Sequence, residues 1–214
     1  MSAVMVYNMN IEMKHLTKKY DGKTVLDDFS LVLPQKGTVC LFGPSGCGKT
    51  TLLNCIAGLE TVDSGEIIGV QDKKISYLFQ EDRLLPWISA KENVAAVLHS
   101  NANQNAEEAE KWLALVGLAG EGDKLPSQLS GGMRQRVAIA RALAYRGGLY
   151  LLDEPFHALD DERKSQIITL IQEQTPDSLK ILVTHDFHEA ELFADVTYLL
   201  SGPPVKIGKI ITKC

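Results

Sequence analysis

The chain has 214 residues, with 22 Lys and Arg against 27 Asp and Glu, and therefore a formal net charge of −5 at pH 7. This length predicts one large domain, or a domain with a subdomain, and the mildly acidic charge disfavours a general nucleic-acid-binding protein, which normally carries a basic stripe. Hydrophobic residues make up 45% and charged residues 23%, which excludes a disordered, collagenous or fibrous protein.

Short apolar runs with turn-like flanks recur along the chain and predict β-strands. They occupy residues 11–16, 29–33, 38–42, 74–79, 148–153, 179–184 and 196–200. Helical patterns lie between them, and the clearest places Ala109, Trp112, Leu113 and Val116 on one helix face. Strands that alternate with helices predict an α/β fold in which a mostly parallel sheet is covered on both faces.

The alternation is interrupted between residues 82 and 145, where the pattern is helical and no strand is evident. Ser89 and Glu92 form a capping box that predicts the start of a helix, and the polar stretch 101–104 predicts a connection between two helices. We expect residues 82–145 to be a helical subdomain inserted between two strands of one sheet. The whole chain, 1–214, is then a single domain.

Residues 43–50 read GPSGCGKT and match the phosphate-binding pattern G-x-x-x-x-G-K-[ST] in full, between the strand 38–42 and a helix predicted for 49–57. The glycines let successive backbone N–H groups point at phosphate oxygens, and the helix N-terminus adds positive potential. Lys49 would neutralise the β- and γ-phosphates, and the Thr50 hydroxyl would ligate Mg²⁺. The candidate nucleotide-binding residues of this segment are Gly43, Pro44, Ser45, Gly46, Cys47, Gly48, Lys49, Thr50 and Thr51.

The apolar strand predicted for 148–153 ends in two acidic residues, Asp153 and Glu154. Transfer of a phosphoryl group to water needs a metal ion and a group that orients the water. We assign Asp153 to Mg²⁺ and Glu154 to the role of general base.

Residues 129–136 read LSGGMRQR and resemble the LSGGQ-type signature of ATP-binding cassette (ABC) ATPases, in a form common among bacterial importers. Ser130, Gly131 and Gly132 offer a hydroxyl and bare backbone amides at the start of a predicted helix, which is a second anion site. In the family, the signature of one subunit covers the γ-phosphate on the phosphate loop of the other. The resemblance therefore implies a P-loop NTPase fold of the ABC type, with an antiparallel β subdomain, and a head-to-tail homodimer or pseudo-dimer that holds two ATP molecules.

The resemblance covers about residues 11–211 and implies roles for further positions. Tyr20 corresponds to the aromatic residue that stacks on adenine, Gln80 to the glutamine that senses Mg²⁺ and the γ-phosphate, and His185 to the switch histidine. Gln135 of the signature and Asp160, in the loop that crosses the dimer interface, join the nucleotide-binding set. The implied catalytic residues are Glu154, His185 and Lys49, and the implied Mg²⁺ ligands are Thr50, Gln80 and Asp153.

The segment 80–87 reads QEDRLLPW and looks like a stretch typical of the nitrate, sulfonate and taurine importer group. We expect Leu84, Leu85 and Trp87 to line a groove for a short helix of a membrane permease subunit; alternatively, Trp87 packs inside the helical subdomain. The sequence shows no export signal and no apolar run of the about 18–20 residues that cross a bilayer. The expected location is peripheral, on the cytoplasmic face of the cell membrane, without a nucleic-acid partner.

Two other functions fit the same motifs. An ABC ATPase can drive a non-transport membrane complex, such as one for lipoprotein release or division-site signalling, or it can be a nucleotide-gated interaction module whose hydrolysis is incidental. His157 stands where importers of this group usually have Ser or Thr, and either tunes dimer closure near neutral pH or is an exposed neutral variant.

Overall fold

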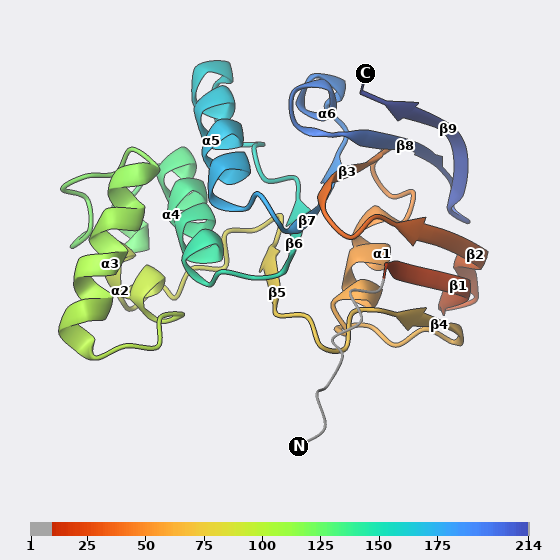
Figure 1. The fold of residues 1–214 in the computed structure, drawn as a ribbon, viewed down its shortest axis with the longest axis horizontal. Coiled ribbons are helices and arrows are strands. Elements are labelled where there is room, and N and C mark those ends of the chain that lie inside the picture. Colours follow the sequence, from red (N-terminus) through yellow and green to blue (C-terminus); the bar gives the residue numbers. More distant parts are fainter. Residues whose placement is uncertain (1–9, 214) are drawn as a thin grey trace.

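The structure, a computed structural model, describes residues 10–213 and contains two β-sheets (Figure 1). The strands of the larger sheet lie in the order β5 (Ile75–Leu78), β6 (Leu149–Asp153), β7 (Leu179–Thr184), β3 (Gly37–Phe42), β8 (Val196–Ser201) and β9 (Lys206–Thr212). All neighbours pair in parallel except β8 and β9, which are antiparallel. The smaller sheet is antiparallel, with the order β2 (Lys23–Leu33), β1 (Ile11–Tyr20) and β4 (Ser64–Ile68).

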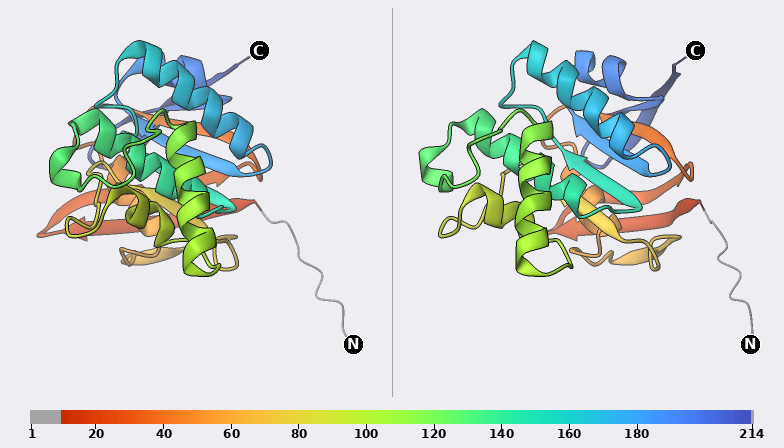
Figure 2. Two further views of the ribbon diagram at one scale, coloured as in Figure 1. Left: turned by 90° about the vertical axis from the view of Figure 1, so that its left-hand side faces the viewer. Right: turned by 60° about the vertical axis from the view of Figure 1, so that its left-hand side comes forward.

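The larger sheet is covered on both faces because its central strands are apolar on both sides. Successive side chains of β6 alternate between two cores: Leu149 and Leu151 pack with the smaller sheet, whereas Tyr150 and Leu152 pack with the helices. Figure 2 shows the two sides, with α5 (Asp161–Gln174) and α6 (Phe187–Phe193) on one and β1 and β4 on the other. The predicted α/β fold with a mostly parallel sheet, an antiparallel sheet and helices is confirmed.

Between β5 and β6 the chain forms helices and, within the described residues, no strand. These helices are α2 (Ala90–Ala95), α3 (Ala102–Leu115), a short 3₁₀ turn (Pro126–Gln128) and α4 (Gly131–Ala144). The predicted capping box starts α2, because the Glu92 N–H donates to Ser89 Oγ at 3.2 Å and the Ser89 N–H donates to Glu92 Oε2 at 2.8 Å. In Figure 1, α2, α3 and α4 lie at the opposite end of the molecule from β8 and β9. The division into one domain with an inserted subdomain stays a prediction, and residues 1–9 and 214 lie outside the described residues.

Each of the seven predicted strands coincides with an observed one, but β4 and β9 were not predicted. The prediction for 101–104 is wrong beyond its first residue, because Asn101 caps α3 and residues 102–104 form its first turn. The helix after the phosphate loop, α1 (Lys49–Ile56), ends one residue earlier than predicted.

In residues 10–213 no helix is both long and apolar enough to span a bilayer.

Candidate functional site

The loop between β3 and α1 has the backbone geometry that its glycines allow. Gly46 and Gly48 have φ angles of 77° and 110°, and Gly48 is the N-cap residue of α1. A Cβ on Gly48 would lie 2.6 Å from Val205 Cγ2 and 2.8 Å from Val25 Cγ1, so only glycine fits there. The buried Lys49 donates to the carbonyl oxygens of Gly43 at 2.7 Å and Pro44 at 2.9 Å, which fixes its ammonium group beside the loop.

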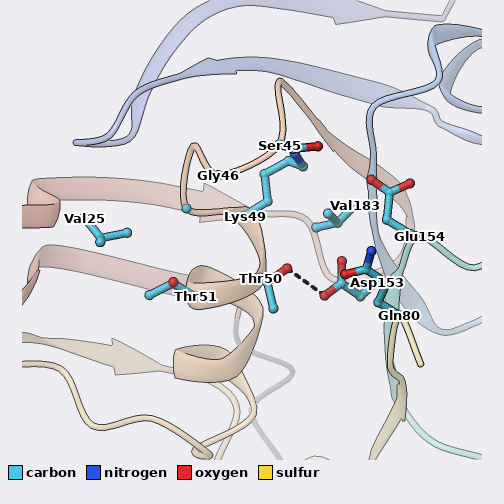
Figure 3. A pocket seen from close by; sticks show the side chains of 11 residues that line it. Val25, Ser45, Gly46, Lys49, Thr50, Thr51, Gln80, Asp153, Glu154 and Val183 are labelled. Carbon is cyan, nitrogen blue, oxygen red and sulfur yellow. Dashed lines mark hydrogen bonds between the residues drawn. The ribbon is translucent and has the colours of Figure 1, made fainter. Parts of the chain in front are cut away.

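This loop forms one wall of a cavity of about 240 Å³ (Figure 3). The other walls come from segments far apart in the sequence, because β5, β6 and β7 are parallel neighbours and end at the same edge of the sheet. The lining residues are Val25, Ser45, Gly46, Gly48, Lys49, Thr50, Thr51, Gln80, Asp153, Glu154 and Val183. The fold thus brings the phosphate loop, Gln80 and both candidate acidic residues to one cavity.

Asp153, at the end of β6, has oxygens suited to a divalent cation. Its Oδ2 accepts a hydrogen bond from the Thr50 hydroxyl at 2.8 Å, whereas its Oδ1 is buried without a hydrogen-bond partner among the described residues. Burial raises the pKa of Asp153, and the Thr50 hydrogen bond only partly opposes this. The buried Asp153 Oδ1, together with the Thr50 hydroxyl and the Gln80 side-chain amide, fits Mg²⁺. This ion prefers oxygen ligands and binds substrate phosphates in addition to a few protein groups. Residues 10–213 contain no group of three or more His, Cys, Asp or Glu that could hold a metal.

Glu154 and His185 form a pair beside the cavity. Glu154 Oε1 lies 2.7 Å from His185 Nδ1, and the Glu154 side chain is 12% exposed against 62% for His185. The Glu154 backbone has φ 47° and its N–H donates to the Val183 carbonyl oxygen at 2.9 Å, which fixes the direction of the side chain. One carboxylate oxygen of Glu154 is thus held by the imidazole and the other remains for a second interaction.

The residues after Gln80 are held by two arginines of α4. The Arg134 Nε donates to Asp82 Oδ2 at 3.0 Å, and Arg141 donates to the carbonyl oxygens of Asp82 at 2.9 Å and Arg83 at 3.0 Å. These hydrogen bonds attach the start of the segment 80–87 to α4. Sequence reasoning missed both arginines, because nothing in their local pattern indicates a partner more than fifty residues away.

The predicted signature and interface residues do not line this cavity. Ser130 and Asp160 are the N-cap residues of α4 and α5, and their side chains accept backbone N–H groups at 3.2 Å and 2.8 Å. Gln135 is buried and donates to the Pro155 carbonyl oxygen at 2.7 Å. Ser130 and Gly131 are exposed. Within one chain, Ser130 and Asp160 begin helices and Gln135 braces α4 against the residues after β6.

Tyr20 lies at the end of β1 and is 37% exposed. The pKa of its hydroxyl is raised because burial outweighs the opposite effect of a hydrogen bond with the cavity residue Thr51. This contact places the ring next to the cavity wall, and its stacking role stays a prediction. His157 is exposed, and its Nδ1 lies 2.9 Å from the Glu154 carbonyl oxygen.

The three apolar residues of the segment 80–87 separate into a buried and an exposed group. Leu84 is 9% exposed and belongs to the core of the helical segment, whereas Leu85 is 38% and Trp87 72% exposed. The alternative interpretation, in which Trp87 packs inside the helical subdomain, is wrong.

The chain is similar to known proteins in both sequence and structure. Residues 26–157 match the family described as ABC transporter. The aliphatic sulfonates import ATP-binding protein SsuB of Bacillus cereus (strain ZK / E33L) is 39% identical, over 97% of this chain and 86% of its own length. The taurine import ATP-binding protein TauB of Escherichia coli (strain K12) is 41% identical, over 92% of this chain and 82% of its own length. A dimeric post-hydrolysis structure of the ATP-binding cassette MJ0796, bound to ADP and Pi, has a TM-score of 0.84 and 28% identity, covering 94% of this chain and 98% of that one.

Proposed function

This chain belongs to the family of ABC transporter ATP-binding proteins, and from that premise we propose that it hydrolyses ATP to power a bacterial importer with separate permease subunits. One observation carries the proposal: the phosphate loop, Asp153 and the Glu154–His185 pair converge on one cavity at the edge of the parallel sheet. The predicted identity as an ATPase subunit of the sulfonate and taurine importer group agrees with the relatives found.

The polar and charged groups in and beside the cavity each have a role in the transfer of a phosphoryl group to water. The N–H groups of the phosphate loop and the Lys49 ammonium bind the phosphates, and Glu154 orients the attacking water and accepts its proton. His185 holds Glu154 and, with Lys49, stabilises the negative charge that develops on the γ-phosphate. Thr50, Asp153 and Gln80 would hold Mg²⁺, which when bound polarises the phosphate oxygens.

We propose that the site is completed by a second copy of the chain. Ser130 and Gly131 are exposed at the start of α4 and line no part of the cavity described above. A helix N-terminus with free amides is suited to a phosphate, and the similar cassette MJ0796 is a dimer. In a head-to-tail homodimer each signature would cover the ATP on the other subunit.

We further propose that the subunit binds permease subunits at the cytoplasmic face of the membrane through a docking surface formed by Leu85 and Trp87. An exposed tryptophan beside an exposed leucine is a typical anchor for a partner helix. The surface continues from Gln80 in the cavity through the segment that Arg134 and Arg141 hold. Occupation of the cavity and the position of the docking surface are therefore physically linked.

The relatives import an aliphatic sulfonate or taurine, which is itself a sulfonate. We infer that the importer served by this chain takes a small organosulfonate, which the permease and not this chain would select. An ATPase rate that a sulfonate raises in the presence of the permease supports this proposal. A rate indifferent to permease and sulfonate would instead favour a non-transport complex or a nucleotide-gated interaction module.

Glu154→Gln tests the assignment of the catalytic base. Because the amide cannot accept the proton of the water, we expect ATP hydrolysis by the purified chain to fall by at least about a hundredfold. ATP binding should persist, and a dimer should accumulate with ATP in light scattering. The matched control Glu66→Gln changes an exposed carboxylate on β4 and should leave the rate unchanged. An undiminished rate for Glu154→Gln would contradict the assignment.

A further inference from the structure

Next to the Glu154–His185 pair lies a charged cluster around one buried carboxylate, which no step above uses. Glu189 of α6 has a side chain only 3% exposed, and its Oε1 lies 2.9 Å from the Nζ of Lys164 on α5. The same ammonium group lies 3.2 Å from Asp186 Oδ2. A buried carboxylate needs such a partner, because an unpaired charge in the interior costs several kcal/mol.

The cluster reaches the catalytic pair through the hydroxyl of Thr184, the residue before His185. This fully buried hydroxyl accepts the Asp186 N–H at 3.0 Å, which closes a turn around His185. It has a single proton to donate, and two carboxylates compete for that proton. Glu189 Oε2 lies at 2.7 Å and Glu154 Oε2 at 3.5 Å, so the proton goes to Glu189.

We propose that Lys164 and Glu189 are positioning residues for ATP hydrolysis, which hold the Thr184 hydroxyl away from Glu154 so that Glu154 Oε2 stays free to accept the proton of water. The inference rests on the proposed roles of Glu154 and His185. Its physical basis is geometric: a lone pair of Glu154 Oε2 that accepts the Thr184 hydroxyl proton is not available to accept a hydrogen bond from the attacking water. Without the Lys164 ammonium, the Glu189 carboxylate is no longer held in place, and the Thr184 hydroxyl turns to Glu154.

The charge state of Lys164 is consistent with this arrangement. Burial lowers its pKa, but the carboxylates of Glu189 and Asp186 outweigh that effect and leave the pKa raised. Lys164 is thus an ammonium throughout the pH range in which the ATPase would work.

A double-mutant cycle tests the proposal with Lys164→Met and Thr184→Val, both in the purified full-length chain. Lys164→Met should lower kcat roughly tenfold and change KM for ATP less than twofold, because Lys164 does not line the cavity that would hold ATP. In the Thr184→Val background there is no hydroxyl to misdirect, so Lys164→Met should have little further effect on kcat. Lys164→Arg, which keeps the charge, should recover most of kcat.

Additive losses of kcat in the cycle, or a wild-type kcat for Lys164→Met, would overturn the inference. Lys36→Met serves as the control, because Lys36 is an exposed, ion-paired lysine at the opposite end of β3 from the phosphate loop. Should Lys164→Met not fold, Lys164→Gln, an uncharged donor to Glu189, takes its place with the same expected result. A wild-type chain without ATPase activity would overturn the proposed function itself. If instead Glu154→Gln is inactive while Lys164→Met is fully active, only the positioning inference fails.

Discussion

The phosphate loop and the signature are both glycine-rich segments that begin a helix, yet they differ in backbone conformation and in exposure. The phosphate loop ends at Gly48 in a left-handed conformation, and its lysine is buried against loop carbonyl groups. The signature starts α4 with an ordinary N-cap, Ser130, whose backbone is extended and whose side chain satisfies its own helix. The first segment lines a cavity with the catalytic groups, and the second is exposed. The difference is the one expected from the proposed dimer, in which the phosphate loop binds ATP within its own chain and the signature contacts the ATP of a second copy.

The largest effect is expected in the phosphate loop, from Gly48→Ala. A side chain there is strained by the φ of 110° and would overlap Val205 and Val25, so the loop must open. We expect ATP affinity to fall at least about a hundredfold, equivalent to about 2.7 kcal/mol, in calorimetric titration. The control Gly58→Ala also has a positive φ but meets open space outside the site. Gly58→Ala should lower the free energy of unfolding by about 1 kcal/mol and leave ATP binding intact. Equal ATP affinity of the Gly48→Ala and Gly58→Ala variants would contradict this prediction.

The next largest effect distinguishes the signature from the phosphate loop. Gly131→Ala in the signature should lower ATPase turnover without lowering ATP affinity. Within one chain the atom nearest to the added Cβ is Arg134 Nη2 at 3.9 Å, so neither the fold nor the cavity is disturbed. A partner phosphate would meet that methyl group, and we expect ATPase turnover to fall about tenfold or more. Gly148→Ala, which also has room for a Cβ, is the control. Unchanged turnover in Gly131→Ala would show that the start of α4 contacts no nucleotide.

Trp87→Ala should affect only the complex with the permease. Because the indole is 72% exposed, its loss should change the free energy of unfolding by less than about 0.5 kcal/mol. Basal ATPase activity should also persist. Permease binding should weaken about tenfold or more, as expected for an aromatic anchor, whereas Ile210→Ala, at an exposed position of β9, should have no effect. A loss of basal activity would mean that Trp87 supports the cavity and not the docking surface.

The smallest effect concerns stability and pH, through Asp186→Ala. Burial raises the pKa of Asp186, but hydrogen bonds from Lys164 and the His188 N–H outweigh this and lower it below its ordinary value of 3.8. A lowered folded pKa means that the stabilisation is fully present above the ordinary value of 3.8 and is lost as the pH falls from there through the pKa of the folded state. Since Asp186 caps α6, we expect a loss of about 1 kcal/mol at neutral pH, and in urea titrations the difference from wild type should shrink progressively as the pH falls from 3.8 through the lower pKa of the folded state. A difference independent of pH would exclude the carboxylate as its source.

The phosphate loop and the pair Asp153–Glu154 were predictable because their chemistry is written in consecutive residues. Gln80 was assigned only through the family resemblance, and its position near Asp153 and Glu154 agrees with parallel neighbouring strands that end at one edge of the sheet. The strand β4 was missed because its sequence, SGEII, begins with turn-forming residues, and β9 because two lysines and a glycine interrupt its apolar pattern.

The contacts behind the site could not be predicted in the same way. Lys164 and Glu189 lie on exposed-looking, polar helix sequences, and only the packing of α5 against α6 makes them a buried pair. The hydrogen bond of Thr184 to Glu189 likewise depends on where α6 begins. Local patterns predict which residues carry chemistry, whereas tertiary packing decides which of them are partners.

The strand order also constrains how such a chain can be made. Among the described strands, the neighbours of β3, the strand that precedes the phosphate loop, are β7 and β8, which begin at Leu179 and Val196. During synthesis from the N-terminus, β3 and the phosphate loop after it therefore have no neighbouring strand until β7 has been made. We expect chains that stop before β7 to bind no ATP, so nucleotide binding would itself report that β7 and β8 have been made and have paired with β3.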